Sequence, residues 1–433
     1  MTEGLRARGT ERQVTALAIG LAAGFVGLTL ASLLLPDTAR LGAWLPLHLL
    51  LAGAATTAIA GVMPFFSAAV SGAPPAPAAI RLLAVAAVAG GALVIAAGRL
   101  LSPPLTGADP PLAGLGGLVY LVGLIAVATA TLLPLRSALG PRRFVMGTIY
   151  GVAILNAVIG AALGTLLLLG WSEIAGGWAA LKPAHAWLNV FGFVSLAIAG
   201  SLLHLLPTVA GARISRTRSS IVCFAAVASG PLVAAIGFAI TSQPLAVLGA
   251  AVLVVGALAL AIHGANVLRA RATWTTDPDW HRFATRSLVA GIGWFVVGTV
   301  IAATSVVAGW STHEAWRLAP LVAPIGIGWV GQVLVGAWSH LLPAVGPGSP
   351  ERHAGQRRAL GLGGTVRLAL VNGGVAAMVV AGFVPELGVL FAVGLVGAAL
   401  AGVAAVALIG RALLLPDPRV PGSVFGASGG LLA

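Results

Sequence analysis

The chain has 433 residues, of which 59% are hydrophobic and only 8% are charged. This composition excludes an ordinary soluble domain and is typical of a polytopic membrane protein. A formal net charge of +13 could indicate a nucleic-acid partner, but the basic residues lie in loops on one side of the predicted topology, so we expect no such partner. The single cysteine, Cys223, excludes an internal disulfide.

Twelve apolar stretches follow one another along the chain, and each is long enough to cross about 30 Å of hydrocarbon. They cover roughly residues 14–35, 45–70, 82–98, 111–135, 144–171, 184–210, 220–241, 244–268, 287–310, 318–345, 368–384 and 386–410. We therefore predict an all-α polytopic membrane protein with twelve transmembrane helices. The whole chain, 1–433, is expected to form one integral domain in contact with the lipid bilayer.

The lysines and arginines are divided unequally between the two sides of these helices. The two terminal segments and the loops after even-numbered helices hold 20 of the 24, whereas the other loops hold Arg40, Arg99, Lys182 and Arg317. Basic residues favour the cytoplasmic side, so both termini are predicted to be cytoplasmic. Richness in arginine, alanine, glycine, valine and leucine indicates a high-GC bacterial genome, and we expect a multi-pass protein of the bacterial inner (cytoplasmic) membrane.

Three of the stretches resemble one another, at residues 45–70, 184–210 and 320–345. The second and third share the pattern Gly-x3-His-Leu-Leu-Pro, which ends at Pro207 and Pro343. The first carries Ala-Ile-Ala-Gly at 58–61, which recurs at 197–200. Such spacing predicts an internal repeat of four-helix units. The predicted units are about 1–70 together with 346–433, then 71–210, then 211–345.

Polar residues within the predicted helices are few, and none of the aspartates or glutamates falls in the middle of one. A proton-coupled transporter usually carries a buried carboxylate, so this absence argues against that class. The outer side instead collects tryptophans, which indicate an interfacial aromatic belt or, as an alternative, a wall for a planar cofactor. These tryptophans are Trp44, Trp171, Trp178, Trp310 and Trp316.

Histidines occur at two depths. His48 and His185 lie near the outer ends of the second and sixth helices, at similar heights in repeat-related segments. Neutral imidazole is a good ligand for heme iron and for copper, and two helices can supply one ligand each. A structural or interfacial role is the alternative for this pair. His204 and His340, each followed by Leu-Leu-Pro, are better interpreted as repeat-related helix ends.

The chain resembles subunit I of the heme-copper oxidase superfamily, in which the second, sixth and tenth of twelve helices are repeat-related. The residues that carry the resemblance are Pro46-Leu47-His48, His185 with Gly192, Gly200 and Pro207, and Gly328-Trp329-Val330-Gly331 with Gly336-Ala337 and Leu342-Pro343. The resemblance implies twelve helices in three arcs and a heme b or copper site. The NnrS-like family of twelve-helix heme- and copper-containing membrane proteins is a second resemblance.

The sequence also departs from the oxidase pattern. Leu321 and Ala323 stand where that family has two heme-ligating histidines, and residues 220–241 contain no histidine for copper. Tyr120 and Tyr150 are the only tyrosines, and neither is a candidate for the family's tyrosine cross-link near copper. We therefore do not expect a complete oxygen-reducing enzyme.

The resulting expectation is an oxidase-subunit-I-like protein that binds heme b, or copper, near the outer face. His48 and His185 are the predicted ligands, and Trp187 and Asn189 are predicted to shape the pocket. Its role would be electron transfer or the sensing of a small diatomic gas, with an extracytoplasmic redox protein as a candidate partner. The alternative is a cofactor-free permease or structural membrane subunit with the same fold.

Overall fold

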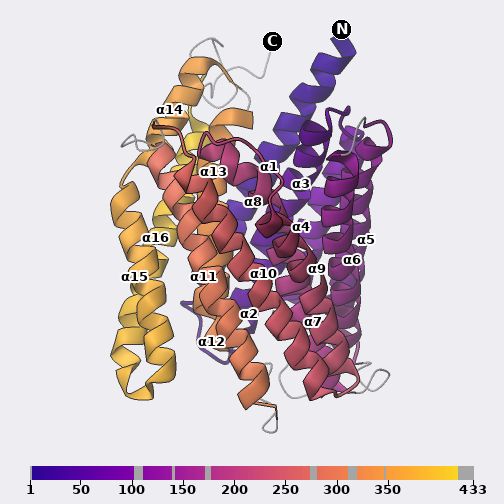
Figure 1. The fold of residues 1–433 in the computed structure, drawn as a ribbon, viewed down its shortest axis with the longest axis vertical. Coiled ribbons are helices and arrows are strands. Elements are labelled where there is room, and N and C mark those ends of the chain that lie inside the picture. The colour runs from indigo at the N-terminus through magenta and orange to yellow at the C-terminus, as the bar shows by residue number, and fades with distance from the viewer. Residues whose placement is uncertain are drawn as a thin grey trace, which may run out of the picture.

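The computed structural model describes residues 2–101, 111–138, 142–170, 177–273, 280–310, 319–345 and 348–417. This part of the chain contains helices and turns but no strand, and it includes twelve helical spans that are long and apolar enough to cross a membrane. The predicted all-α fold with twelve transmembrane helices is therefore confirmed. Most of the helices run along the long axis of the molecule (Figure 1).

Nine of the spans consist mainly of one helix each. These helices are α1 (Thr2–Ser32), α4 (Ala78–Leu100), α5 (Pro111–Leu132, continued by the 3-10 turn η2, Leu133–Arg136), α6 (Arg142–Leu168), α9 (Arg218–Ala239), α10 (Gln243–Arg269), α11 (Trp280–Ala308), α15 (Gly364–Phe383) and α16 (Gly388–Leu414, after the 3-10 turn η7, Pro385–Leu387). A short polar helix outside the twelve spans, α14 (Pro350–Gly361), precedes α15. Ser349 begins it as an N-cap, because its hydroxyl accepts from the Arg352 amide.

The other three spans are the second, sixth and tenth, and each contains a π-helical segment. They are α2–η1–α3 (Trp44–His48, Leu49–Ala55, Thr56–Ser71), α7–η4–α8 (Trp178–Trp187, Leu188–Ser195, Leu196–Val209) and α12–η6–α13 (Ala319–Leu321, Val322–Gly331, Gln332–Val345). A proline lies shortly before η1 and η4, at Pro46 and Pro183, and Pro324 lies within η6. Because proline lacks an N–H and crowds the preceding turn, it favours such departures from regular α-helix.

These three helices form the centre of the molecule. In their apolar stretches 72%, 89% and 72% of residues are buried, against 22% to 50% in the other nine spans. Segment η1 contacts both η4 and η6. A buried hydrogen bond of 3.1 Å from the Trp329 indole N–H to the Ser195 hydroxyl joins η6 to η4. Three segments that the sequence identifies as similar are thus packed against one another.

Side chains of the surrounding helices also donate hydrogen bonds to backbone carbonyls of the π-helical segments. The Asn156 amide on α6 donates to the Gly192 carbonyl of η4 at 3.0 Å, and the Tyr120 hydroxyl on α5 donates to the Ala52 carbonyl of η1 at 3.3 Å. A polar side chain inside a membrane is stable when it finds such a partner on a neighbouring helix. Asn156 and Tyr120 each form such a contact between helices.

The outer helices repeat one packing order around this centre. The hairpin α4–α5 contacts α6, the hairpin α9–α10 contacts α11, and the hairpin α15–α16 contacts α1. Each of these three single helices in turn contacts the central helix that follows it in the chain. The hairpins are closely packed: a Cβ atom at Gly91 would lie 2.6 Å from the Tyr120 amide nitrogen, and one at Gly230 would lie 2.8 Å from the Gly249 carbonyl oxygen. This recurring order is what the predicted three-unit repeat requires.

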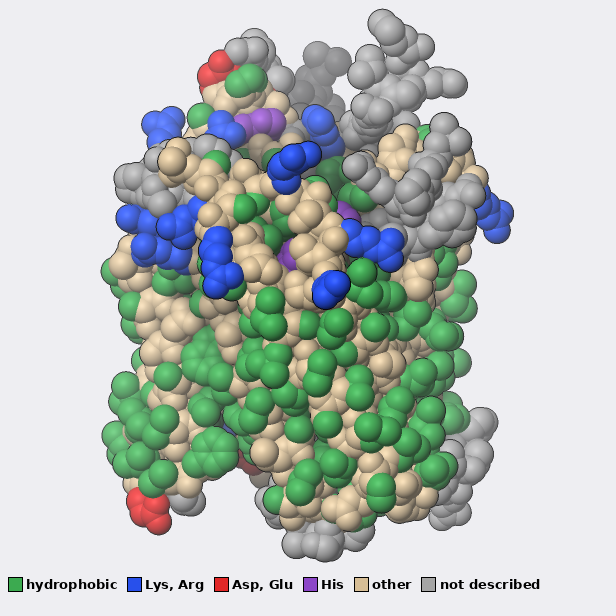
Figure 2. Space-filling model, in the orientation of Figure 1, with side chains coloured by type: hydrophobic (Ala, Val, Ile, Leu, Met, Phe, Trp, Pro, Cys, Tyr) green, Lys and Arg blue, Asp and Glu red, His purple; other side chains and the backbone are tan. Residues whose placement is uncertain are grey.

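Charge is distributed unevenly along the bundle. Lysine and arginine side chains gather at the end of the molecule where α1 begins, and the middle of the visible face is largely hydrophobic (Figure 2). Helix α16 ends at the same end of the bundle as α14 (Figure 1). An apolar belt of this kind fits contact with lipid. The assignment of the basic end to the cytoplasm stays a prediction.

Candidate functional site

His48 and His185 lie next to each other near the end of the central helices that is opposite the basic end of the bundle, and we call it the outer end after the predicted topology. His48 is the last residue of α2, directly before the π-helical η1, and His185 lies in α7 shortly before η4. Their ring centres are 6.5 Å apart, and the ring planes differ by only 11°. Two imidazoles that are 137 positions apart in the sequence are therefore brought together in nearly parallel orientation.

Each ring is held by a backbone carbonyl through its Nδ1 atom. Nδ1 of His48 lies 2.8 Å from the Trp44 carbonyl oxygen, and Nδ1 of His185 lies 2.7 Å from the Gly160 carbonyl oxygen on α6. A carbonyl oxygen can only accept a hydrogen bond, so Nδ1 carries the proton in both rings and the lone pair is left on Nε2. In the described part of the chain neither Nε2 atom has a hydrogen-bond partner. This arrangement is common for histidines that bind metals.

Asn189 lies directly beside His185, one helical turn further along. Its amide nitrogen is 2.8 Å from the His185 carbonyl oxygen and 3.2 Å from His185 Nδ1. The short contact between His185 and Gly160 needs a proton on Nδ1, which then cannot also accept from Asn189. The amide of Asn189 therefore donates to the carbonyl, and its effect on the ring is to restrict the space beside it.

Two glycines of α6 provide the room for these side chains. A Cβ atom at Gly164 would lie 2.5 Å from Cε1 of His185, and one at Gly160 would collide with the Asn189 amide. Because glycine has no Cβ atom, His185 and Asn189 can lie against the backbone of α6. Because the glycines are four residues apart, they occupy one face of the helix. The position of His185 thus depends on α6 as much as on its own helix.

Trp44 covers the other side of the pair. Its ring stacks on His48 with centres 4.1 Å apart, and the guanidinium carbon of Arg99 lies 5.9 Å from the centre of the Trp44 ring. His48, His185 and Asn189 are all only partly buried, although they lie within the bundle. The other described outer tryptophans contact different groups: Trp178 lies near the Lys182 ammonium, and Trp310 stacks on Phe238. Trp171 and Trp316 lie outside the described residues.

Trp187 does not share the contacts of the histidine pair. Its ring packs on Phe191 at 4.9 Å and on Phe238 of α9 at 5.9 Å, and only 2% of its surface is exposed. With Trp310, which follows the end of α11, these rings form an aromatic row that includes residues of α7, η4 and α9. The structure therefore brings His48, His185 and Asn189 together, and it shows Trp187 in a separate aromatic contact.

The inner histidines have different surroundings. His204 and His340 lie near the inner ends of α8 and α13, where each precedes a Leu-Leu-Pro sequence. His263 on α10 is 2% exposed, and in the described part of the chain neither of its ring nitrogens has a hydrogen-bond partner. Asn266, three residues later, is exposed and accepts from the Arg269 guanidinium at 2.9 Å. Of these two residues on one helix, Asn266 is thus exposed and His263 is buried.

The spacing of the outer pair suits a shared metal ion. A metal bonded to one nitrogen of each ring at about 2.0 Å, the usual metal–imidazole length, with the two nitrogens on opposite sides of it, needs ring centres roughly 6 Å apart. The observed 6.5 Å is close to that value. Both nitrogen atoms with a free lone pair belong to neutral imidazoles, which suit iron and copper. The donor set thus fits either heme iron or copper.

The sequence did not single out Gly160 and Gly164, which shape this site, and it indicated Trp44 only as part of an aromatic belt or of a cofactor wall. Trp44 stands four residues before His48, which is one helical turn, and Gly160 and Gly164 share one face of α6. These spacings are visible in the sequence, but they gain meaning only when α2 and α6 are known to lie beside the two histidines. No protein-family model and no curated protein matches the chain. The functional argument therefore depends on the site itself.

Proposed function

We propose that this is an oxidase-subunit-I-like membrane protein that binds heme b near its outer face, with copper as the alternative metal. His48 and His185 are the ligands. The proposed role is electron transfer or the sensing of a small diatomic gas, in the bacterial inner membrane. The observation that carries the proposal is the pair of imidazoles with ring centres 6.5 Å apart, each with Nδ1 bonded to a backbone carbonyl.

The protein's own contribution would be to hold both ligands ready. The carbonyls of Trp44 and Gly160 fix the tautomers, so no proton has to leave Nε2 before a metal binds. The glycine face of α6 and the ring of Trp44 restrict how far the two imidazoles can turn. When bound, heme iron supplies one-electron redox chemistry or a site for a diatomic gas.

The proposal is limited to a two-histidine site. At the start of the third central helix the side chains of Leu321 and Ala323 are apolar and buried. A binuclear oxygen-reducing centre needs more ligands than one such pair provides. We therefore propose that electrons are exchanged with another redox protein, on the extracytoplasmic side where the histidine pair lies.

The test is an absorption spectrum and a metal analysis of the detergent-purified protein from heme-sufficient cells. We expect a Soret band in the wild-type protein that is lost in His48→Ala and in His185→Ala but kept in His204→Ala, an inner histidine on the same central helix as His185. Copper without a Soret band, lost in the same two variants, would select the alternative metal. A colourless and metal-free preparation would refute the proposal and favour the cofactor-free permease or structural subunit.

A further inference from the structure

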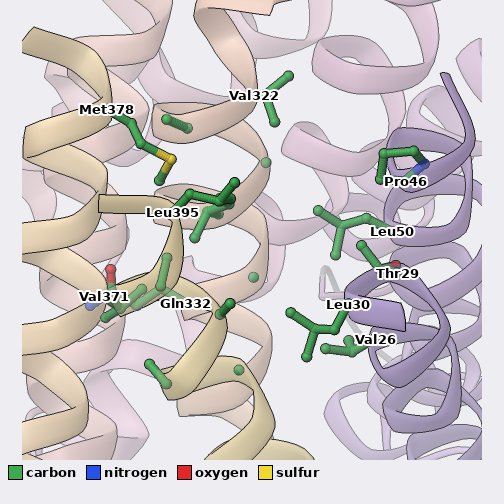
Figure 3. Close-up of a pocket in the computed structure, with 18 of the residues that line it drawn as sticks. Val26, Thr29, Leu30, Pro46, Leu50, Val322, Gln332, Val371, Met378 and Leu395 are labelled. Carbon is green, nitrogen blue, oxygen red and sulfur yellow. The ribbon is translucent and has the colours of Figure 1, made fainter. Parts of the chain in front are cut away.

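A cavity of about 600 Å³ lies between the α15–α16 hairpin and the rest of the bundle. Val26, Thr29 and Leu30 of α1, together with Pro46 and Leu50, face it from one side (Figure 3). Val371, Met378 and Leu395 of the hairpin face it from the other side, and η6 and α13 contribute Val322 and Gln332 (Figure 3). All of these helices belong to membrane spans, so the cavity opens within the apolar layer.

Gln332 is a buried polar residue in this mostly aliphatic lining. It is the first residue of α13, lies near the middle of the span Val322–Ala344, and is only 4% exposed. In the described part of the chain neither its amide nitrogen nor its amide oxygen has a hydrogen-bond partner. A buried polar group without a hydrogen-bond partner destabilises the folded protein. A bound molecule that supplies the missing hydrogen bond would remove this cost.

Each charged residue of the lining already has a partner, although the Nε atoms of Arg40 and Arg367 have none in the part of the chain that the structure describes. Arg40 forms an ion pair of 2.8 Å with Asp37, and the guanidinium of Arg367 lies 3.9 Å from the centre of the Phe283 ring and donates to the Leu360 carbonyl. The cavity therefore favours a neutral ligand over one that carries a phosphate group. The remaining wall is mostly aliphatic, which fits a long hydrocarbon chain.

The depth of Gln332 further restricts the ligand. It is separated from either end of its span by about ten residues, or roughly 15 Å of helix. The ester oxygens of a phospholipid stay at the interface, so they do not reach this depth. A neutral ring with oxygen substituents and an isoprenoid chain can enter the hydrocarbon layer. We infer that the cavity binds an isoprenoid quinone, with the Gln332 amide hydrogen-bonded to a ring oxygen.

The amide of Gln332 suits both redox forms of such a molecule. It has two N–H donors for a quinone carbonyl and an oxygen that accepts from a quinol hydroxyl. The cavity and the histidine pair share one helical segment: Pro46, Leu47 and Leu50 line the cavity, and His48 of the same segment stacks with His185. Binding of the quinone does not require heme or copper, so this inference goes beyond the proposed function and can fail independently of it.

Binding can be followed by tryptophan fluorescence, because Trp338 lines the cavity and quinones quench indole emission. The full-length protein in phosphatidylcholine nanodiscs is titrated with decylubiquinone. We expect saturable quenching in the wild-type protein and a Kd about tenfold higher in Gln332→Leu, as for loss of one hydrogen bond. Because this substitution removes an unsatisfied amide, the variant should be at least as thermally stable as the wild type.

A second variant tests the cavity itself. Val371→Phe fills space in its wall, whereas Leu248→Phe, on the exposed surface of α10, is the matched control. We expect weaker quenching in the first variant and unchanged quenching in the control. The inference is overturned by a linear, unsaturable response, by the same Kd in Gln332→Leu and the wild type, or by displacement of the quinone by phosphatidylglycerol at equal concentration. None of these results depends on a Soret band.

Discussion

Histidines occur at both ends of the central helices, and the two groups differ in what holds them. At the outer end, His48 and His185 each have Nδ1 bonded to a backbone carbonyl, and their rings lie side by side. At the inner end, His204 and His340 belong to the repeated Gly-x3-His-Leu-Leu-Pro pattern. The comparison teaches that the most regular sequence pattern marks helix ends, whereas the histidines outside that pattern are oriented as metal ligands would be.

Removal of a ligand should give the largest effect. Replacing either outer histidine, in His48→Ala or His185→Ala, is expected to lower metal or heme affinity by more than the roughly 10- to 100-fold typical for loss of a ligand's hydrogen-bond partner. Cofactor content per protein, measured by the pyridine hemochrome assay or by metal analysis, checks this. Full occupancy in both variants would show that the outer pair is not the ligand set.

The glycine face of α6 gives the next largest effect. Gly164→Ala would put a methyl group 2.5 Å from Cε1 of His185, so the ring must turn away. We expect cofactor affinity to fall about tenfold, as when the support of a ligand is lost. Gly151→Ala on the same helix is the matched control, because a Cβ atom there has no neighbour within 4 Å. If both variants bind alike, the position of His185 does not depend on α6.

A third substitution separates the scaffold from the site. Trp329→Phe removes the indole N–H that donates to Ser195, while the Ser195 hydroxyl keeps its 2.8 Å bond to the Val190 carbonyl. Loss of this bond should destabilise the protein by about 1 kcal/mol without changing the spectrum of a bound cofactor. Thermal unfolding in detergent measures the effect, with the exposed Trp178→Phe as control. An unchanged midpoint would mean that η4 and η6 are held together by packing alone.

The smallest effect is expected at the inner end. His204→Ala and His340→Ala should leave the cofactor spectrum and occupancy unchanged, since both positions lie at the opposite end of the central helices from His48 and His185. The measurement is the same absorption spectrum, recorded beside the outer variants. A spectral loss in either inner variant would remove the distinction between the two groups of histidines.

Much of the fold can be read from the sequence, because helix length and hydrophobicity directly determine what can cross a membrane. The twelve spans were accessible from apolar runs, and the similarity of the second, sixth and tenth could be read from the sequence, whereas their central position could not. The start of the sixth span at Trp178 was not, because its first turns carry Lys182 and Pro183 and score as a loop. The polar helix α14 was missed because it has no apolar face.

The candidate site was only partly predictable. Similar heights in repeat-related helices suggested that His48 and His185 could meet, and the structure brings them together. Asn189 follows from helical spacing, since it lies one turn from His185. The separate packing of Trp187 could not be foreseen, because it depends on which face of α7 meets Phe238 of α9. The hydrogen bond from His185 to the Gly160 carbonyl could not be foreseen either, because every residue has a backbone carbonyl and the sequence does not show which one a side chain will contact.

The π-helical segments set the rotational phase of the three central helices. A regular α-helix turns by about 100° per residue, and a π turn accommodates one residue more than an α turn at nearly the same length. Deleting one residue from η4 would therefore let one π turn close into an α turn with little rotation of His185 relative to Pro207, whereas the same deletion in the regular helix α8 would rotate the two by about 100°. The outer and inner halves of each central helix are thus phased against each other by backbone geometry.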